Sequence, residues 1–365
     1  MVRRHKGREQ VGEREVLVDY QALRGLVAQL FAGAGMSEPD AAFHAKALVD
    51  ANLWGIDSHG VLRVPIYVKR MRSGAINPRP NIRTVRGSLG LEVLHGDDGP
   101  GYIVGRDAML RAIELAGQYN VAAVGAIRSN HFGATASYSR LAAEQGMIGI
   151  SMTNVVPNVV APGGSKPVVG NNPLSIAVPT YAEFPFVLDI SLSAVAGGKL
   201  LLASKKGEKI PLDWATDNEG RPTDDPDKAF AGFLLAMGGY KGLGLAYAVD
   251  ILCGLITGGV FLHEMKGMYK YPDEPSLTGH MMIAINIEAI LGRDEMAARM
   301  AQFTRTVKES PMWDKSREMF LPGEIEHLTA RKRMEAGVPL PENLYDELVA
   351  LGRQAGLSST LPAVG

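Results

Sequence analysis

Nine consecutive residues, 55–63, combine four side chains that can do chemistry: the carboxylate of Asp57, the hydroxyl of Ser58, the imidazole of His59 and the guanidinium of Arg63. If the chain turns helical within this stretch, His59 and Arg63 stand four residues apart and project from one face. Arg63 is then able to grip a carboxylate through two parallel hydrogen bonds, while His59 titrates near neutral pH beside it. The alternative is that Asp57 or Ser58 only caps a helix and that Arg63 is solvated on its outer face.

A second polar group, 128–133, contains His131. It follows an apolar run that is typical of a strand, 121–127, and precedes a helical pattern. In α/β sheets the carboxyl ends of the strands face the ligand crevice, so His131 stands where a catalytic residue would. The alternative is a histidine that fills or caps a turn.

Several other chemistries do not fit the sequence. Ser58 is not in a nucleophile elbow, because the preceding glycine is one place too early for Gly-x-Ser-x-Gly. His263-Glu264 lacks the second histidine of a zinc motif, and we predict no metal. The Gly-x-Gly that begins at Gly242 has Tyr247 in place of the last glycine of a Rossmann fingerprint. A protein that only binds or scaffolds is not excluded.

Two segments are suited to anions or ribose. Gly238 to Gly242 leads into a long apolar run, so free backbone N–H groups, the helix dipole and Lys241 together could hold a phosphate or carboxylate. The alternative is a helix start whose glycines serve packing. Asp189 and Ser191 end a predicted strand and could accept from ribose hydroxyls, although such residues often only start turns.

The composition narrows the class of protein. A formal net charge of −1 provides no long-range attraction to nucleic acid or to an anionic membrane, so we expect neither as a partner. The single cysteine cannot form an intrachain disulfide, which is typical of a reducing cytoplasm. Residues 1–15 are highly charged and lack the apolar centre of a secretory signal, and we predict that 1–18 form a solvated tail. The apolar run 242–261 approaches the length of a membrane span, but Asp250 and five glycines interrupt it, so we predict a buried helix.

A chain of 365 residues exceeds one ordinary core, so we expect two closely packed domains. The first part of the chain reads as all-helical, and the alternation of strands and helices that follows is typical of an α/β domain. The long segments 154–170 and 192–239 read as irregular, and loops of that length usually bind something. We expect the last helices to pack on the first ones, which divides the chain into a helical domain, 19–75 plus 308–365, and an α/β domain, 76–307. The predicted helices are 20–33, 38–49, 61–71, 102–118, 134–145, 292–306, 324–335 and 342–353, and the predicted strands are 91–94, 121–127, 148–153, 184–190 and 281–287.

A series of ordered motifs resembles the malate/L-lactate/sulfolactate dehydrogenase family, NAD(P)-dependent oxidoreductases that also include ureidoglycolate, diketogulonate and piperideine-2-carboxylate enzymes. The resemblance extends from about residue 20 to residue 350. The motifs are Asp57-Ser58-His59-Gly60 with Arg63, Ser129-Asn130-His131-Phe132-Gly133, Gly170-Asn171-Asn172-Pro173, Asp189-x-Ser191, Trp214-Ala215-x-Asp217-x-x-Gly220-x-Pro222-Thr223, Gly238-Gly239-x-Lys241-Gly242-x-Gly244-Leu245-Ala246 and Pro322-Gly323-Glu324.

This resemblance implies an α/β protein with a non-Rossmann nicotinamide-binding fold, in which a helical domain formed by both chain ends lies beside a mixed-sheet domain. It also implies a homodimer. The residue matching His131 is the acid/base in some members and the one matching His59 in others, so both stay candidates, while Arg63 matches the arginine that holds the substrate carboxylate. The expected cofactor, NAD or NADP, would contact Asn154, Asp189, Ile190, Ser191, Gly238, Gly239, Lys241, Gly323 and Glu324.

The expected reaction is hydride exchange between the nicotinamide and the hydroxyl-bearing carbon of a small 2-hydroxy acid. His131 would move the hydroxyl proton, and Ser58, His59 and Asn172 would orient the hydroxyl or carbonyl. Reduction of a cyclic imine acid and a non-catalytic NAD(P)-binding sensor remain alternatives. Where many relatives have arginine before Gly-Lys, this chain has Ala196-Gly197-Gly198-Lys199, which leaves the choice between NAD and NADP open.

Overall fold

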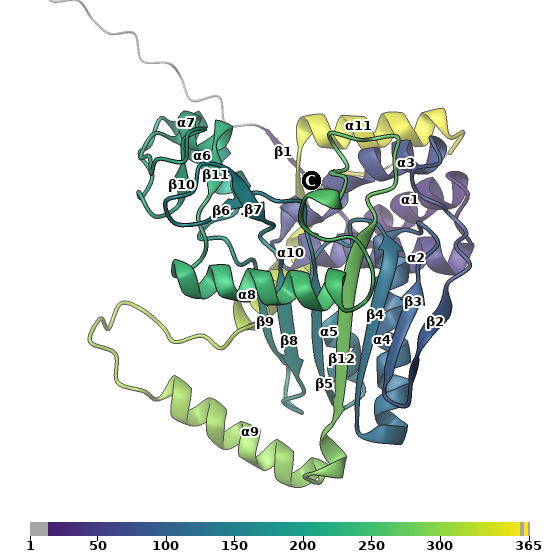
Figure 1. Cartoon of the computed structure of the whole chain (residues 1–365), viewed down its shortest axis with the longest axis vertical. Coiled ribbons are helices and arrows are strands. Elements are labelled where there is room, and N and C mark those ends of the chain that lie inside the picture. Colours follow the sequence, from purple (N-terminus) through teal and green to yellow (C-terminus); the bar gives the residue numbers. More distant parts are fainter. Residues whose placement is uncertain (1–13, 358–360, 364–365) are drawn as a thin grey trace, which may run out of the picture.

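The protein is built on a seven-stranded mixed sheet, as the computed structural model of residues 14–357 and 361–363 shows (Figure 1). In spatial order the strands are β2 (Arg83–Ser88), β3 (Leu91–His95), β4 (Val121–Ser129), β12 (Thr278–Asn286), β5 (Met147–Thr153), β8 (Leu174–Val178) and β9 (Phe186–Ile190). Only β3 and β4 are parallel, and all other neighbours are antiparallel. The carboxyl ends of β3, β4, β5 and β9 therefore meet at one edge of the sheet. The expectation of a mixed-sheet α/β fold is confirmed.

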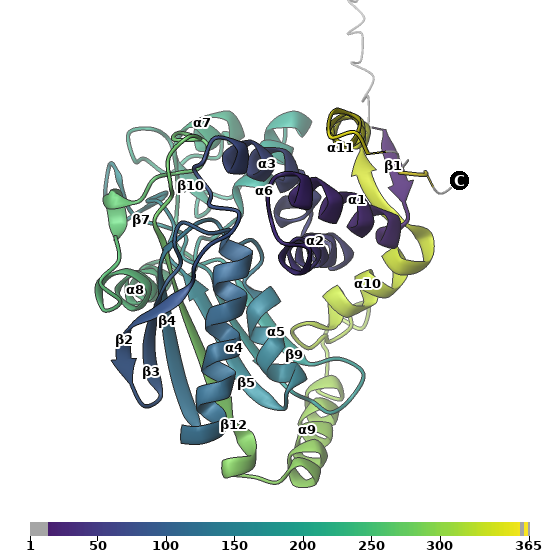
Figure 2. The same ribbon diagram turned by 90° about the vertical axis from the view of Figure 1, so that its right-hand side faces the viewer.

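Helices cover both faces of this sheet (Figures 1 and 2). One face carries α4 (Gly101–Tyr119) and α5 (Ala136–Glu144). Small residues on the strands allow this close packing, since a Cβ at Gly149 of β5 would lie 2.2 Å from a carbonyl oxygen of α5. The other face carries α8 (Tyr240–Asp250), which continues into a π-helical turn, Ile251–Leu255.

The expectation that 242–261 form a buried helix is only half right, because one face of α8 and its extension is open. Leu245, Tyr247, Ile251 and Leu255 are exposed, whereas Leu243, Ala246 and Val249 pack on the sheet side. No helix among the described residues has the length and apolarity to cross a membrane.

Both ends of the chain contribute to a helical layer that packs on the α4 side of the sheet (Figure 2). The side chain of Asp19 caps the first helix and that of Ser37 caps the second. Helical layer and sheet share one continuous apolar core. The helices are α1 (Tyr20–Gly33), α2 (Glu38–Leu53), α3 (Val64–Arg72), α10 (Glu324–Ala336) and α11 (Glu342–Gln354).

The expected solvated tail, 1–18, is wrong for its last residues. Strand β1 (Glu15–Val18) pairs antiparallel with β13 (Val338–Pro341) near the other end of the chain. Val18 is buried, so its apolar side chain and the main-chain bonds of the ladder together stabilise this pair. Residues 1–13 of the expected tail lie outside the described residues.

The segment between β5 and α8, which the sequence predicts to be largely irregular, contains a small lobe with its own sheet. Its apolar core gathers Val195, Leu200, Ile210 and Ala215. The lobe consists of β6 (Val159–Val160), β7 (Pro167–Val169), β10 (Ala215–Thr216), β11 (Phe233–Leu234), α6 (Gly197–Lys206) and α7 (Pro226–Ala231), with the strand order β10-β11-β6-β7.

Helix α9 (Arg293–Lys308) projects from the body of the molecule (Figure 1). It has no buried residue, and Trp313 in the loop that follows is 95 % exposed. The expectation that all C-terminal helices pack on the N-terminal ones is therefore wrong for α9, although α10 packs on α2 and α11 on α1 and α3.

Candidate active site

Polar residues from distant parts of the chain gather at the edge where the strands' carboxyl ends meet. His131 follows β4, Asn154 follows β5, and Asp189 and Ser191 stand at the end of β9. The helical layer adds two short 3-10 turns, Asp57–His59 and Val61–Arg63. The structure thus brings the two histidine-bearing motifs of the sequence to one place.

The imidazole of His131 lies between His59 and Tyr67. Its ring stacks on that of His59 with centroids 5.6 Å apart, and Tyr67 Oη is 2.6 Å from His131 Nδ1. Burial, and then the proximity of His59 and Arg63, lowers the pKa of His131 well below its ordinary value. Burial and Arg63 lower the pKa of His59 to about 4. Both rings are therefore neutral at neutral pH.

The loop that carries His131 is rigidly held. Gly133 has φ +71°, and a Cβ there would lie 1.6 Å from Tyr102 Oη, so only glycine fits. Phe132 stacks on His280 with ring centroids 4.4 Å apart. His280 is itself buried between Thr153 Oγ1, 2.8 Å from its Nδ1, and Ser129 Oγ, 2.7 Å from its Nε2.

Arg63 faces the two histidines although 55–63 is not the single helix that the sequence suggests. Gly60 breaks the stretch into two turns, because its backbone is extended at φ −89° and ψ −149°. Arg63 folds back, and its Nε donates to Ser58 O at 2.8 Å, while its Nη1 donates to Tyr269 Oη. Ser58 Oγ lies 2.9 Å from His59 Nδ1. Ser58, His59 and Arg63 thus form one group.

Asp57 has a structural role instead. Its carboxylate pairs with the Arg333 guanidinium of α10 at 2.7 and 3.0 Å and accepts from Asn52 Nδ2 at 2.6 Å. It ties the first motif to the C-terminal helices and does not face His131.

Two predicted asparagines lie close to this edge but bridge the backbone. The Asn172 side chain accepts from Val155 N and donates to Ala246 O, both at 2.8 Å. Asn154 accepts from Gly279 N at 2.8 Å and donates to Val260 O at 3.0 Å. Both amides are fully buried, so they position the loops that border the site.

Asp189 and its neighbours end β9 beside the His131 loop. Asp189 Oδ2 accepts from Ala136 N at 2.9 Å, at the start of α5, and burial raises its pKa to about 6. Ser191 Oγ accepts from Asn171 Nδ2 at 2.9 Å. Ile190 packs against the apolar core on the α8 side of the sheet.

The remaining predicted cofactor residues form two separate groups. Gly238 and Gly239 have φ +62° and +69° just before α8, and no atom lies within 4 Å of a Cβ built at either position. Lys241 in the first turn of α8 is exposed. Gly323 (φ +92°) packs on β9, since the carbonyl before it accepts from Val187 N.

Glu324 turns away from solvent and caps its own loop. Its Oε2 accepts from Leu321 N at 3.0 Å, and its Oε1 pairs with Lys308. The side chain is buried, so its part in a cofactor site would be to shape the backbone near Gly323.

Sequence reasoning missed Tyr67, Arg70, Asn130 and Tyr269. Tyr67 stands four residues after Arg63, and this spacing could have revealed it. Asn130 stands next to His131 in the motif 129–133, but nothing in the sequence shows that it contacts Arg70. Tyr269 is 206 residues beyond Arg63 in the chain, and no local pattern marks it.

A model of a protein family described as malate/L-lactate dehydrogenase matches residues 18–349. The chain is 36% identical to a malate dehydrogenase of Pyrococcus abyssi over 355 residues, which cover 95% of this chain and 97% of the relative. It is 38% identical to an L-sulfolactate dehydrogenase of Methanocaldococcus jannaschii over 333 residues, which cover 91% and 95%. The solved structure of sulfolactate dehydrogenase from Methanocaldococcus jannaschii superimposes with a TM-score of 0.88 at 37% identity and covers 93% of this chain and 98% of that one.

Two further relatives carry a cofactor in their names. A (2R)-3-sulfolactate dehydrogenase (NADP(+)) of Chromohalobacter salexigens is 34% identical over 92% of this chain and 97% of its own length. A ureidoglycolate dehydrogenase (NAD(+)) of Escherichia coli is 31% identical over 91% and 95%. Both nicotinamide cofactors thus occur among the similar proteins.

Proposed function

Because this chain belongs to the malate/L-lactate dehydrogenase family, we propose that the edge where His131, His59 and Arg63 meet is the site of a 2-hydroxy-acid dehydrogenase. The protein is an NAD(P)-dependent oxidoreductase that acts on small 2-hydroxy acids and their 2-oxo counterparts. The observation that supports this assignment of the active site is the stacked pair of neutral imidazoles beside a guanidinium. Such a group can hold a carboxylate and move a proton next to it.

Arg63 holds the substrate carboxylate in this proposal. Its Nε and Nη1 are used within the fold, which leaves Nη2 among the described atoms for an incoming anion. Ser58 and His59 stand beside it and orient the hydroxyl or carbonyl of the same substrate. Asn172 acts indirectly, because its hydrogen bonds to Val155 N and Ala246 O position the backbone that borders the site.

His131 transfers the proton. Burial raises the pKa of Tyr67 above its ordinary value, so its hydroxyl stays protonated, and in this proposal its oxygen accepts from the Nδ1–H of neutral His131. The Nδ1–H tautomer leaves the lone pair of Nε2 to accept the hydroxyl proton in oxidation and to return it in reduction, a step typically worth about 10²- to 10⁴-fold in rate. His59 is the alternative proton carrier.

NAD(P), when bound, supplies or accepts the hydride. The open backbone at Gly238 and Gly239 fits a phosphate group, because free N–H groups at the start of α8 and the Lys241 ammonium attract an anion there. Asp189, Ile190 and Ser191 at the end of β9, with Asn154 and the Gly323–Glu324 turn, complete the proposed cofactor site.

The function is tested by following NADH and NADPH absorbance with a panel of oxaloacetate, pyruvate, sulfopyruvate and a cyclic imine acid. Turnover of a 2-oxo acid supports the proposal. Preferred turnover of the imine would identify an imine-acid reductase, whereas tight cofactor binding with no turnover of any panel member would indicate a sensor and contradict the proposal.

A homodimer and a cytoplasmic location are part of the proposal. An isolated helix such as α9 is marginal in water, yet its Met296, Met300 and Phe303 form an apolar stripe that the described residues do not bury. The exposed apolar side of α8 is a second such stripe, and a second copy of the chain can cover both. The single cysteine, Cys253, is buried and unpaired, as suits a reducing compartment.

A further inference from the structure

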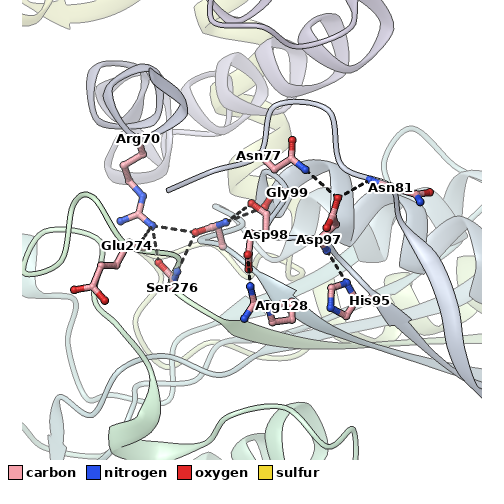
Figure 3. Close-up of polar contacts among 11 residues, drawn as sticks. Arg70, Asn77, Asn81, His95, Asp97, Asp98, Gly99, Arg128, Glu274 and Ser276 are labelled. Carbon is pink, nitrogen blue, oxygen red and sulfur yellow. Dashed lines mark hydrogen bonds and ion pairs between the residues drawn. The ribbon is translucent and has the colours of Figure 1, made fainter. Parts of the chain in front are cut away.

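Arg70 of α3 is a buried cation whose hydrogen-bond partners among the described residues are all neutral. It is 1% exposed, and the carboxylate of Asp273 acts on it only through its charge, without a hydrogen bond. Its Nη1 donates to the carbonyl oxygens of Met268 (3.3 Å) and Tyr271 (3.1 Å), and its Nη2 donates to that of Glu274 at 2.9 Å. Figure 3 shows the guanidinium against this loop. Burying a charge is costly unless hydrogen bonds satisfy it, so this planar fork specifies the position of the loop.

The same guanidinium also holds the residue before His131. Arg70 Nη2 lies 3.0 Å from Asn130 Oδ1 and 3.1 Å from Ser276 Oγ. Asn130 Nδ2 in turn donates to Asp98 O at 2.8 Å and to Gly99 O at 3.1 Å, in the turn after β3. Ion pairing of Asp98 with Arg128 fastens that turn to the end of β4 (Figure 3). Asn130 is thereby fixed from both sides.

The loop that Arg70 anchors, residues 265–276, reaches Arg63, which is the carboxylate clamp of the proposed site. Its Tyr269 contacts Arg63 through the hydroxyl, and the Arg63 guanidinium carbon lies 5.7 Å from the Tyr269 ring centroid. Tyr269 is 64% exposed, so packing of its own does not hold it. The anchoring bonds of Arg70 to the flanking carbonyls are what place it.

We propose that Arg70 is a positioning residue that couples the two halves of the active site. Through the loop 265–276 it sets Tyr269 against Arg63, and through Asn130 it sets His131, so that the carboxylate clamp and the proton carrier face one substrate. This inference rests on the proposed roles of Arg63 and His131. Lysine retains the charge of Arg70 but cannot reproduce its fork.

The charge of Arg70 has a separate effect that distinguishes it from a purely structural residue. The charged and titratable groups that face His131 are Tyr67, His59, Arg63, His280 and Arg70. After burial, the last four each lower the pKa of His131. Removing the charge of Arg70 therefore raises that pKa, whereas a change of side-chain shape alone does not.

The experiment compares Arg70→Lys and Arg70→Met with the wild type, and uses Arg111→Lys in α4, where Arg111 pairs with Glu92 and Glu114, as a control. Both Arg70 variants are expected to lose kcat/KM for the 2-oxo acid by about 10²-fold, because small misplacements of reacting groups have effects of that size. The dissociation constant of NADH, measured by fluorescence, should stay within twofold. In the oxidation direction, only Arg70→Met should move the acid limb of the pH profile to higher pH.

Hydrogen exchange gives a readout that is independent of activity. Amides of 265–276 should exchange faster in Arg70→Lys, while those of α4 should not change. If the wild type turned over no 2-oxo acid, the proposed function would fail, but faster exchange would still support the anchor. Should Arg70→Met not fold, Tyr269→Phe tests the same coupling and should raise KM while kcat stays unchanged.

Three results would overturn the inference. The first is kcat/KM of Arg70→Lys within twofold of the wild type. The second is weakening of NADH binding in parallel with the loss of kcat/KM, which would indicate general disruption. The third is unchanged exchange in 265–276.

Discussion

The rings of His59 and His131 are stacked, with planes inclined by only 20° and centroids 5.6 Å apart. They come from different layers of the fold, since His59 belongs to the 3-10 turn after α2 and His131 follows strand β4. Close stacking of two imidazoles is stable only when they do not both carry a charge, and Arg63 beside them penalises even one. The pair therefore accepts a proton only together with an anion, which the substrate carboxylate provides.

Replacing each histidine distinguishes the two proton carriers. His131→Asn is expected to reduce kcat about 10²- to 10⁴-fold, because Nε2 no longer accepts the hydroxyl proton. His59→Asn should mainly raise KM. Steady-state kinetics with the best substrate measures both, and the exposed His263 supplies a control, His263→Asn, that should not change either value. A larger kcat loss in His59→Asn would transfer the role to His59.

Arg63→Lys tests the carboxylate clamp. Loss of a charge-assisted hydrogen bond costs about 1.5–3 kcal/mol, so KM should rise roughly 10- to 150-fold. The NADH dissociation constant should not follow it, because Arg63 faces the substrate side. An unchanged KM would contradict the clamp.

Asp189 predicts a specific dependence of stability on pH. Its pKa is raised to about 6 from an ordinary 3.8, so its folded form binds the proton more tightly than the unfolded chain does. Its contribution is fully present below about pH 4 and is lost as the pH rises through about 6. Relative to the wild type, Asp189→Asn should therefore gain stability as the pH rises from about 4 through 6, by about 2–3 kcal/mol at pH 7. Urea unfolding at pH 4, 5, 6 and 7 measures the difference, and a constant offset would contradict it.

His44 predicts a dependence of stability on pH that is opposite in sign to that of Asp189. It is buried between Phe31, with ring centroids 4.3 Å apart, and Tyr102, and neither ring nitrogen has a hydrogen-bond partner among the described residues. Burial lowers its pKa to about 3, so its contribution to stability is lost as the pH falls from about 6.5. His44→Phe should stabilise the protein by about 1–2 kcal/mol at pH 7 and by more at pH 5. Thermal unfolding of both proteins at both pH values checks this. A Tm of His44→Phe below that of the wild type at pH 5 would contradict it.

The open stripe of α9 predicts how the protein assembles. Phe303→Asp places a charge in that stripe and should shift the mass in sedimentation equilibrium from dimer to monomer. Ala298→Asp places the same charge on the opposite side of the helix and should leave the mass unchanged. A wild type that sediments as a monomer would exclude the homodimer.

Local patterns were sufficient for part of the site. A strand followed by polar residues placed His131 at the carboxyl edge, and the four-residue spacing related Arg63 to His59 although Gly60 breaks the helix. In both cases residues close in sequence determine the arrangement. What the patterns could not provide was the choice between the two histidines, because that depends on the Tyr67 hydroxyl and on burial.

Long-range contacts account for the remaining differences. Nothing near Tyr269 indicates that it contacts Arg63, and nothing in 15–18 indicates that it pairs with 338–341. The exposed side of α8 is as apolar as its buried side, so periodicity could not show which parts are covered. The first two depend on a partner more than a hundred residues away, and the third depends on what covers the open side of α8.

The position of β12 constrains how the chain is made. This strand, Thr278–Asn286, lies between β4 and β5, which are synthesised more than a hundred residues earlier. Until β12 has emerged from the ribosome, β4 and β5 each have an unpaired edge, because the strand that lies between them is missing. Such edges are prone to associate with other chains. The last helices must then close over a sheet that has only just been completed. Premature termination before residue 278 therefore leaves a product that lacks the middle of its sheet, a natural substrate for chaperones and proteases.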